Sequence, residues 1–139
     1  EILNEYRKRF RIPVGDVINS ATDAVEHLRL FFKDPHRESF VVMFLNGRNA
    51  LLATEILFSG SISSSAVYPR EIIRRVLNIG AAAIICSHNH PSSNLNPSRD
   101  DLETTKKIKS AASTIDVTVH DHLIVTETGY YSFADHGIL

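Results

Sequence analysis

Two histidines and an aspartate near the middle of the chain have the residue types and the spacing of a metal site. Six apolar residues, 81–86, precede Ser87-His88-Asn89-His90-Pro91, and such a run is typical of a buried strand. Because alternate residues of a strand share a face, His88 and His90 are predicted to point to one side and Asn89 to the other. Two imidazoles held in this way form half of a tetrahedral metal site.

Asp101 is the expected third ligand. Pro91 ends the predicted strand, residues 92–97 are rich in turn formers, and Ser98 is a good N-cap for the helix that follows. Asp101 then lies in the first helical turn, from which its carboxylate can reach back to the histidines. Three protein ligands with a fourth position open to water are typical of catalytic zinc. Alternatively, Ser98-x-x-Asp101 is only a capping box with Asp in place of Glu.

The elements that must position these residues follow from the apolar pattern. A helix is predicted from the N-cap Ser20 to just before Asp34-Pro35, because apolar residues recur there at helical spacing. Asn46-Gly47 is a strong hairpin signal between two strands. The remaining predicted elements are strands at 40–45, 50–58, 117–126 and 130–133 and helices at 69–77 and 100–113.

The combined pattern resembles a known family. His88-x-His90, seven residues and then Ser98-x-x-Asp101 is similar to the JAMM motif of the JAB/MPN metalloprotease fold. The flanking residues resemble the RadC branch of that fold, which has long been labelled "DNA repair protein". The similarity covers residues 20–139, and the flanks that carry it are Ser59-Gly60-Ser61, Tyr68-Pro69-Arg70-Glu71, Ser87 with Pro91-Ser92, Pro97 and Asp121-His122.

This resemblance implies both a fold and a reaction. The implied fold is α/β or α+β: a mixed, largely antiparallel sheet flanked by helices, the JAB1/MPN (cytidine deaminase-like) architecture. The implied reaction is hydrolysis of peptide or isopeptide bonds by zinc held on His88, His90 and Asp101. An alternative, a metal-stabilised scaffold without catalysis, is known in other branches of the fold, but the intact ligand set argues against it.

Glu55 is the predicted general base. It lies in the second predicted strand, which is apolar on both faces, and burial would raise the pKa of its carboxyl. The JAMM motif has a glutamate on a strand upstream of the histidines, a place that Glu55 matches. If the strand is instead an exposed edge, Glu55 needs no chemical role. Ser98 is expected to cap the helix and also to hydrogen-bond the oxyanion that forms on the attacked carbonyl.

Two further polar positions have alternative interpretations. His120-Asp121-His122 could hold a second metal. The preferred prediction is that Asp121 and His122 support the ligands of the first metal. A purely structural hydrogen bond is the remaining alternative. Cys86 lies two residues before His88 and therefore on the same face of the strand, so it could be a metal ligand. A small buried thiol without a ligand role is the commoner case.

Size, composition and missing motifs exclude several classes. The chain has 139 residues, 43% of them apolar, which suits one domain with a buried core. A net charge of -1 gives no overall pull toward nucleic acid or an anionic membrane, and no stretch is long and apolar enough to span a bilayer. One cysteine excludes an internal disulfide and suits a reducing cytoplasm, the expected location. The sequence lacks the motifs of helical zinc proteases, zinc deaminases and phosphate loops.

The expected organisation is an N-terminal arm or helix at 1–19 followed by a RadC-like JAB/MPN domain at 20–139. RadC-like proteins often carry a further N-terminal helical region, and its absence together with a start at Glu1 suggests a fragment. The expected partner is a peptide or protein conjugate that the sequence does not identify, and the oligomeric state is left open. Nucleic-acid binding, the alternative function, is supported only by the family label and by a few basic residues within 7–11.

Overall fold

A computed structural model of the chain describes residues 10–60 and 67–139. Residues 1–9 of the predicted N-terminal arm lie outside the described residues. No helix in the described ranges is long and apolar enough to cross a membrane.

The centre of the fold is a five-stranded sheet in the order β2-β1-β3-β4-β5. Strand β1 pairs antiparallel with both β2 and β3, β3 pairs parallel with β4, and β4 pairs antiparallel with β5. The prediction of a mixed, largely antiparallel sheet is therefore confirmed. The strands are β1 (Glu38–Leu45), β2 (Leu51–Gly60), β3 (Ala83–Asn89), β4 (Thr118–Val125) and β5 (Tyr130–Ser132).

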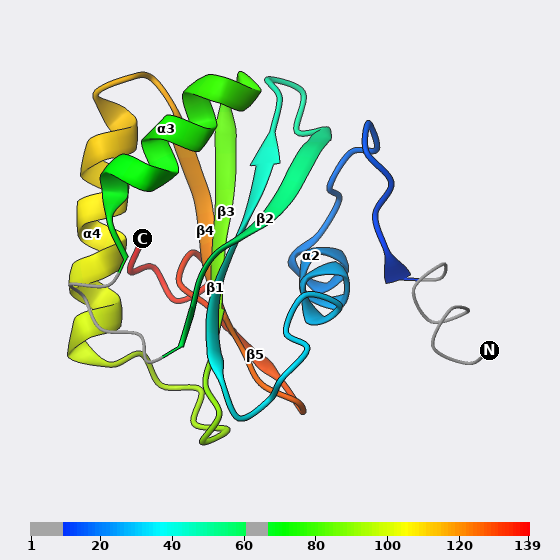
Figure 1. The fold of residues 1–139 in the computed structure, drawn as a ribbon, viewed down its shortest axis with the longest axis vertical. Helices are drawn as coiled ribbons and strands as arrows, with labels where there is room; N and C mark the ends of the chain where they lie inside the picture. Colours follow the sequence, from blue (N-terminus) through cyan, green and yellow to red (C-terminus); the bar gives the residue numbers. More distant parts are fainter. Residues whose placement is uncertain (1–9, 61–66) are drawn as a thin grey trace.

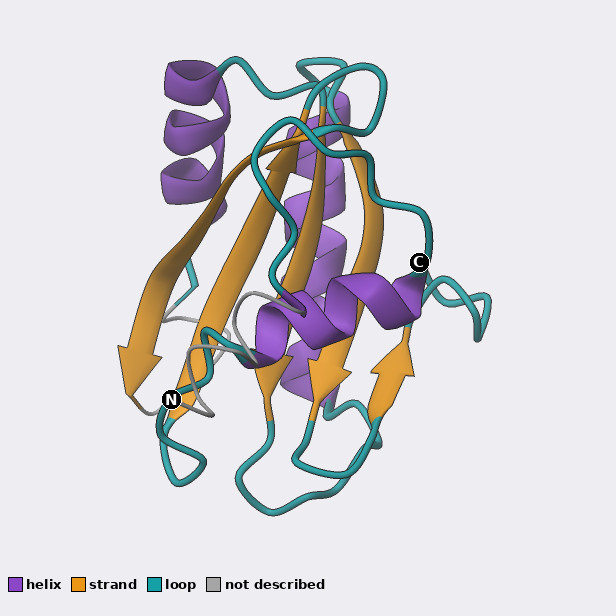
Figure 2. Cartoon of the chain, turned by 90° about the vertical axis from the view of Figure 1, so that its right-hand side faces the viewer, coloured by secondary structure: helices purple, strands orange, loops and turns teal. Residues whose placement is uncertain are grey.

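Helices cover both faces of this sheet. In Figure 1, α3 (Pro69–Ile79) and α4 (Arg99–Ser113) lie on one side of the strands, and α2 (Ala21–Arg29) lies on the other. Figure 2 looks onto the second face, with α2 crossing in front of the strands and the long α4 behind them. This arrangement buries the central strands from both sides, in agreement with their continuous apolar sequence.

Strand β1 shows how the two cores are built. Phe40, Val42 and Phe44 pack into the core under α3 and α4, whereas Val41 and Met43 pack into the core under α2. All five are at most 1% exposed. Because every second residue changes face, one strand supplies both cores, and its position in the sheet is strongly specified.

The register of the strands brings distant residues to one edge of the sheet. Phe40 of β1 lies opposite His88 of β3, so the first residues of β1 lie beside the last residues of β3. Since β3 and β4 are parallel, the chain crosses between them through α4, which begins at the same edge where β3 ends. The start of β1, the end of β3 and the N-terminus of α4 therefore meet.

A buried histidine on α2 fastens the segment before this helix to the domain. The backbone N–H of Ile12 donates to Nδ1 of His27 at 2.8 Å, and Nε2 of His27 lies 2.9 Å from the hydroxyl of Thr54. Since Nδ1 accepts a hydrogen bond, the ring is neutral and its hydrogen lies on Nε2. Burial, helped by the charge of Arg11, lowers the pKa of His27 to about 4.

The neutral state of His27 predicts a loss of stability in acid. In the unfolded chain His27 is protonated near the ordinary pKa of 6.5, but in the folded chain only near 4. Its contribution to the free energy of unfolding is therefore complete above pH 6.5 and is lost as the pH falls from 6.5 to 4. The expected decrease in the free energy of unfolding from pH 7 to 5 is about 2 kcal/mol. Urea unfolding at both pH values should show this decrease in the wild type and a smaller one in His27→Gln. Equal decreases in the two proteins would contradict the assignment.

Candidate metal centre

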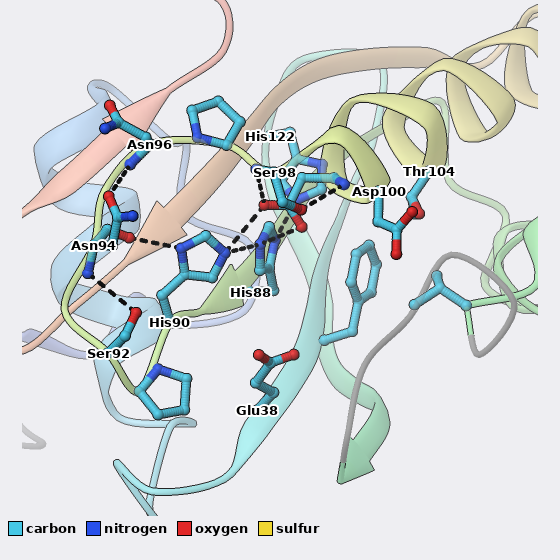
Figure 3. Close-up of a pocket in the computed structure, with 15 residues that line it drawn as sticks. Glu38, His88, His90, Ser92, Asn94, Asn96, Ser98, Asp100, Thr104 and His122 are labelled. Atoms are coloured by element: carbon cyan, nitrogen blue, oxygen red, sulfur yellow. Dashed lines mark hydrogen bonds and ion pairs between the residues drawn. The ribbon is translucent and has the colours of Figure 1, made fainter.

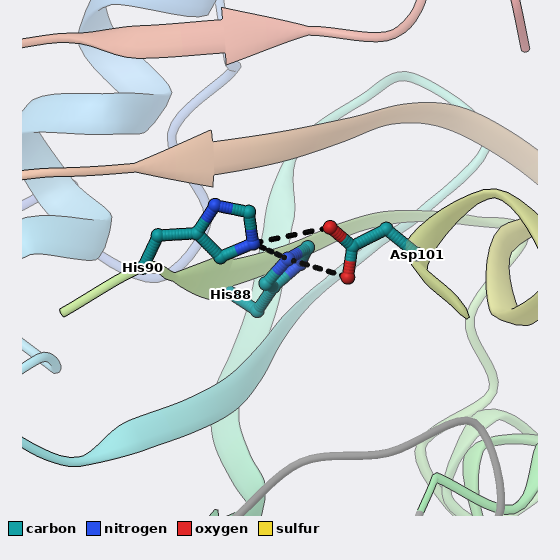
Figure 4. A group of neighbouring side chains, drawn as sticks. All are labelled: His88, His90 and Asp101. Atoms are coloured by element: carbon teal, nitrogen blue, oxygen red, sulfur yellow. Dashed lines mark hydrogen bonds and ion pairs between the residues drawn. The ribbon is translucent and has the colours of Figure 1, made fainter. Parts of the chain in front are cut away.

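The structure brings His88, His90 and Asp101 into one cluster. Nε2 of His88 lies 3.0 Å from Nε2 of His90 and 3.1 Å from Oδ1 of Asp101, while Nε2 of His90 lies 3.1 Å from Oδ2 of Asp101. Figure 4 shows the two rings converging from the end of β3 on a carboxylate that reaches across from the start of α4. Both imidazoles lie on the same side of β3, as predicted.

These donors fit a divalent cation. Ligands of a tetrahedral zinc ion, each about 2.0–2.1 Å from the metal, lie roughly 3.3 Å from one another. The two imidazole nitrogens are 3.0 Å apart and each lies 3.1 Å from a different oxygen of Asp101. With one ligand atom taken from each residue, all three atoms lie within 4.8 Å of one another. Two imidazoles and one carboxylate also form a donor set that suits zinc, and they leave a coordination position for water.

The partners of His90 orient its ring for this task. Nδ1 of His90 lies 2.6 Å from the carbonyl oxygen of Asn94, which can only accept, so Nδ1 carries the hydrogen. In the neutral ring the lone pair of Nε2 then points toward Asp101, a contact that requires a proton or a metal ion between the two atoms. The hydrogen bond to Asp101 raises the pKa of His90, opposed by burial.

Asp101 is both a candidate ligand and a helix-capping residue. Its Oδ2 accepts a hydrogen bond from the backbone N–H of Ser98 at 2.8 Å, and its own N–H donates to Oγ of Ser98 at 3.0 Å. This reciprocal pair is a full capping box. The pKa of Asp101 is set by burial, which raises it, and by hydrogen bonds from His88 and His90, which outweigh burial and hold it well below its ordinary value. The capping box is therefore present, and it does not prevent the same carboxylate from facing the two histidines.

The profile of the RadC-like JAB domain matches residues 18–138. The chain belongs to this family. It is 44% identical to UPF0758 protein YfjY of Escherichia coli (strain K12) over 125 residues, 90% of this chain and 78% of that protein. It is 42% identical to UPF0758 protein PBPRA0202 of Photobacterium profundum over 125 residues, and there it spans only 56% of the relative. Several relatives are thus considerably longer than this RadC-like JAB domain.

The predicted base Glu55 lies away from the cluster of His88, His90 and Asp101. Glu55 sits opposite Val42, which in turn lies opposite Cys86, so it is one strand farther out and two residues short of His88. Arg75 of α3 donates two hydrogen bonds of 2.7 Å to its carboxylate. The prediction of a raised pKa is wrong, because the hydrogen bonds from Arg75 lower the pKa of Glu55 and outweigh the opposing effect of its partial burial.

Glu38 is the carboxylate that sequence reasoning missed. It is the first residue of β1 and lines a pocket of about 550 Å³ together with His88, His90, Ser98 and Asp101. Figure 3 shows its carboxylate pointing toward the two histidines. The register explains the place: Phe40 lies opposite His88, so Glu38, two residues earlier on the same face, reaches the level of His90. The charge of Glu38 also contributes to the raised pKa of His90.

Asn89 fixes the backbone on both sides of Glu38. Its side-chain oxygen accepts from the N–H of Ser39 at 2.7 Å, and its side-chain nitrogen donates to the carbonyl oxygen of Arg37 at 2.9 Å. Asn89 is 5% exposed and points away from the histidines on either side of it, as predicted from strand alternation. The residue between the two candidate ligands therefore holds the start of β1 in place.

A β-bulge separates the two histidines of the second cluster. Ile84 pairs with Val119 but Ile85 pairs with Asp121, so His120 is an extra residue in β4. His120 is exposed and bonds Asn49 at 2.7 Å, whereas His122 is 1% exposed and lies against His88. Simple strand alternation would place His120 and His122 on one face, and the bulge prevents this.

The predicted pair Asp121-His122 divides between two roles. Nε2 of His122 lies 2.7 Å from Nδ1 of His88, a direct contact with a candidate ligand. Asp121 instead accepts from the hydroxyl of Ser132 at 2.6 Å and from the N–H of Ala134 at 3.0 Å, which fastens the C-terminal segment. Cys86 is a fully buried core thiol, and burial raises its pKa to about 12.

An Asp101→Asn substitution separates capping from metal binding. The amide oxygen of the substituted side chain can still accept from the N–H of Ser98, so the free energy of unfolding should change by no more than about 1 kcal/mol. Loss of the charged oxygen should reduce zinc affinity by more than the roughly 10–100-fold typical of residues that only support a ligand. Competition with a chromophoric chelator and urea unfolding measure the two effects. Unchanged zinc affinity would make Asp101 a capping residue alone.

Proposed function

We propose that this RadC-like JAB domain is a zinc-dependent hydrolase of peptide or isopeptide bonds. The observation that carries the proposal is the convergence of His88, His90 and Asp101 at the wall of a pocket that also holds Glu38. Family membership supports the reaction class. Zinc held by these three residues would act as a Lewis acid, lowering the pKa of a water molecule and polarising the carbonyl to be attacked.

Glu38 is the proposed general base in place of Glu55. It takes one proton from the attacking water as the oxygen bonds to the carbonyl carbon. It then gives that proton to the leaving nitrogen as the carbon–nitrogen bond breaks, so that an acid and an amine result. Two features support this role: Glu38 shares the pocket with the ligands, and its carboxylate is half-buried rather than fully solvated. Glu55 is also half-buried, but it does not line this pocket, and Arg75 donates to both of its oxygens.

Ser98 is the proposed oxyanion donor. Its Oγ accepts from the N–H of Asp101 as the helix cap, so its own hydrogen is left to donate elsewhere. The side chain lines the same pocket, on the side opposite Glu38 in Figure 3. A hydroxyl fixed in this way can stabilise the negative charge that develops on the carbonyl oxygen. Capping and catalysis then use different parts of one hydroxyl group.

The substrate class is proposed from the family, and the location is proposed from the cysteine content of the chain. The family supports a peptide or protein conjugate as the substrate, and the net charge of -1 gives no overall attraction to the alternative, a nucleic acid. The cytoplasm is the proposed location, because the chain's one cysteine, Cys86, is a free buried thiol.

Two matched substitutions test the choice of base. Glu38→Gln should retain zinc but lower kcat by about 10²–10⁴-fold, the usual contribution of a general base. Glu55→Gln should retain zinc and most of the turnover, with at most a small loss of stability from the partly exposed pair with Arg75. Turnover is measured on those peptides or isopeptides that the wild type cleaves. If Glu55→Gln is inactive and Glu38→Gln is active, the assignment of Glu38 is wrong.

A further inference from the structure

A chain of hydrogen bonds leads from one candidate ligand back to the backbone of another. Nδ1 of His88 lies 2.7 Å from Nε2 of His122, and Nδ1 of His122 lies 2.6 Å from the hydroxyl of Thr105. The hydroxyl of Thr105 also lies 2.8 Å from the carbonyl oxygen of Asp101. The chain therefore begins at the ring of His88 and ends at the residue whose carboxylate faces that ring.

The surroundings of this chain leave little freedom except in its hydrogens. His88, His122 and Thr105 are 2%, 1% and 4% exposed, so bulk water does not replace their partners. The ring of His122 is stacked on Phe133, with centroids 4.8 Å apart and planes at 17°. The rings of His122 and Phe40 form a T-shaped contact with centroids 5.6 Å apart. The heavy atoms of the chain are thus fixed by packing, whereas the direction of its hydrogen bonds is not.

Counting hydrogens leaves two consistent directions. In one, Thr105 donates to His122, Nε2–H of His122 donates to His88, and Nε2–H of His88 donates to the Asp101 carboxylate. This direction leaves the 2.8 Å contact between the Thr105 oxygen and the Asp101 carbonyl oxygen without a hydrogen. In the other, Thr105 donates to the carbonyl oxygen of Asp101, Nδ1–H of His122 donates to Thr105, and Nδ1–H of His88 donates to His122. Each group keeps one hydrogen in both directions. Only the second direction leaves the lone pair of His88 Nε2 free to bind a metal ion.

We propose that His122 and Thr105 are positioning residues for the metal: zinc binding reverses the direction of this hydrogen-bond chain, and the Thr105 hydroxyl stabilises the reversed state by turning to the Asp101 carbonyl. The inference rests on the proposed function only in requiring that His88, His90 and Asp101 bind zinc. A carbonyl oxygen cannot donate, so it is a fixed acceptor at the far end of the chain. Thr105 can both accept from His122 and donate to Asp101, which an apolar side chain of equal size cannot do.

Three substitutions on α4 test the role of Thr105. Thr105→Val keeps the shape but removes two hydrogen bonds of the Thr105 hydroxyl in the zinc-bound direction and one in the zinc-free direction, so the net loss is one hydrogen bond and zinc affinity should fall by roughly 2–10-fold. Thr105→Ser restores the hydroxyl and should restore affinity to near that of the wild type. Thr104→Val is the matched control, since Thr104 is similarly buried at 6% exposure and its hydroxyl is not part of the chain. Competition with a chromophoric chelator gives the affinities, and thermal unfolding without zinc checks that each variant is folded.

Nitrogen-15 NMR of the histidine rings tests the reversal directly. In the wild type, the hydrogen of His122 should lie on Nε2 without zinc and on Nδ1 with one equivalent of zinc. Equal zinc affinity for Thr105→Val and wild type, or one unchanged tautomer of His122, would overturn this inference and leave the proposed function standing. A wild type that binds no zinc would overturn both.

Discussion

The site depends on one carboxylate that meets two requirements at once. Asp101 caps the N-terminus of α4 through Ser98 and at the same time lies 3.1 Å from each of two imidazoles. The cap fixes the rotation of the first helical turn, so the carboxylate does not have to be ordered when the cluster forms. Because burial alone would raise the pKa of Asp101, its charged form is maintained by the His88 and His90 contacts. A cation at this point would satisfy all three groups.

The sheet supplies the other half of the arrangement. The antiparallel register of β1 and β3 places Glu38 at the level of His90, and the Asn89 side chain holds the backbone of Arg37 and Ser39 on either side of it. The parallel pairing of β3 and β4 brings His122 beneath His88 and requires a crossover, which α4 provides. Each element that carries a site residue is thus positioned by the pairing of the central strands.

The sequence predicted the parts of the site that are local along the chain. Strand alternation placed His88 and His90 together, and the Ser98 cap placed Asp101 in the first turn of α4, because both rules act over a few residues. The sequence predicts Glu55 as the base and gives no sign of Glu38, because it does not show which strand lies next to β3 or with what register. Arg75, which donates to the carboxylate of Glu55, is 20 residues away on α3. The bulge at His120 and the contact of Thr105 with His122 are likewise tertiary, and neither leaves a pattern in a single sequence.

The most direct test of the central claim is the zinc content of the protein, purified without added metal and after zinc is offered, for wild type and His88→Ala. The geometry of the cluster predicts about one zinc per chain in the wild type and a large loss in the variant. Absence of zinc from the wild type under both conditions would contradict the account. His88, His90 and Asp101 would then be a hydrogen-bonded cluster at a capped helix.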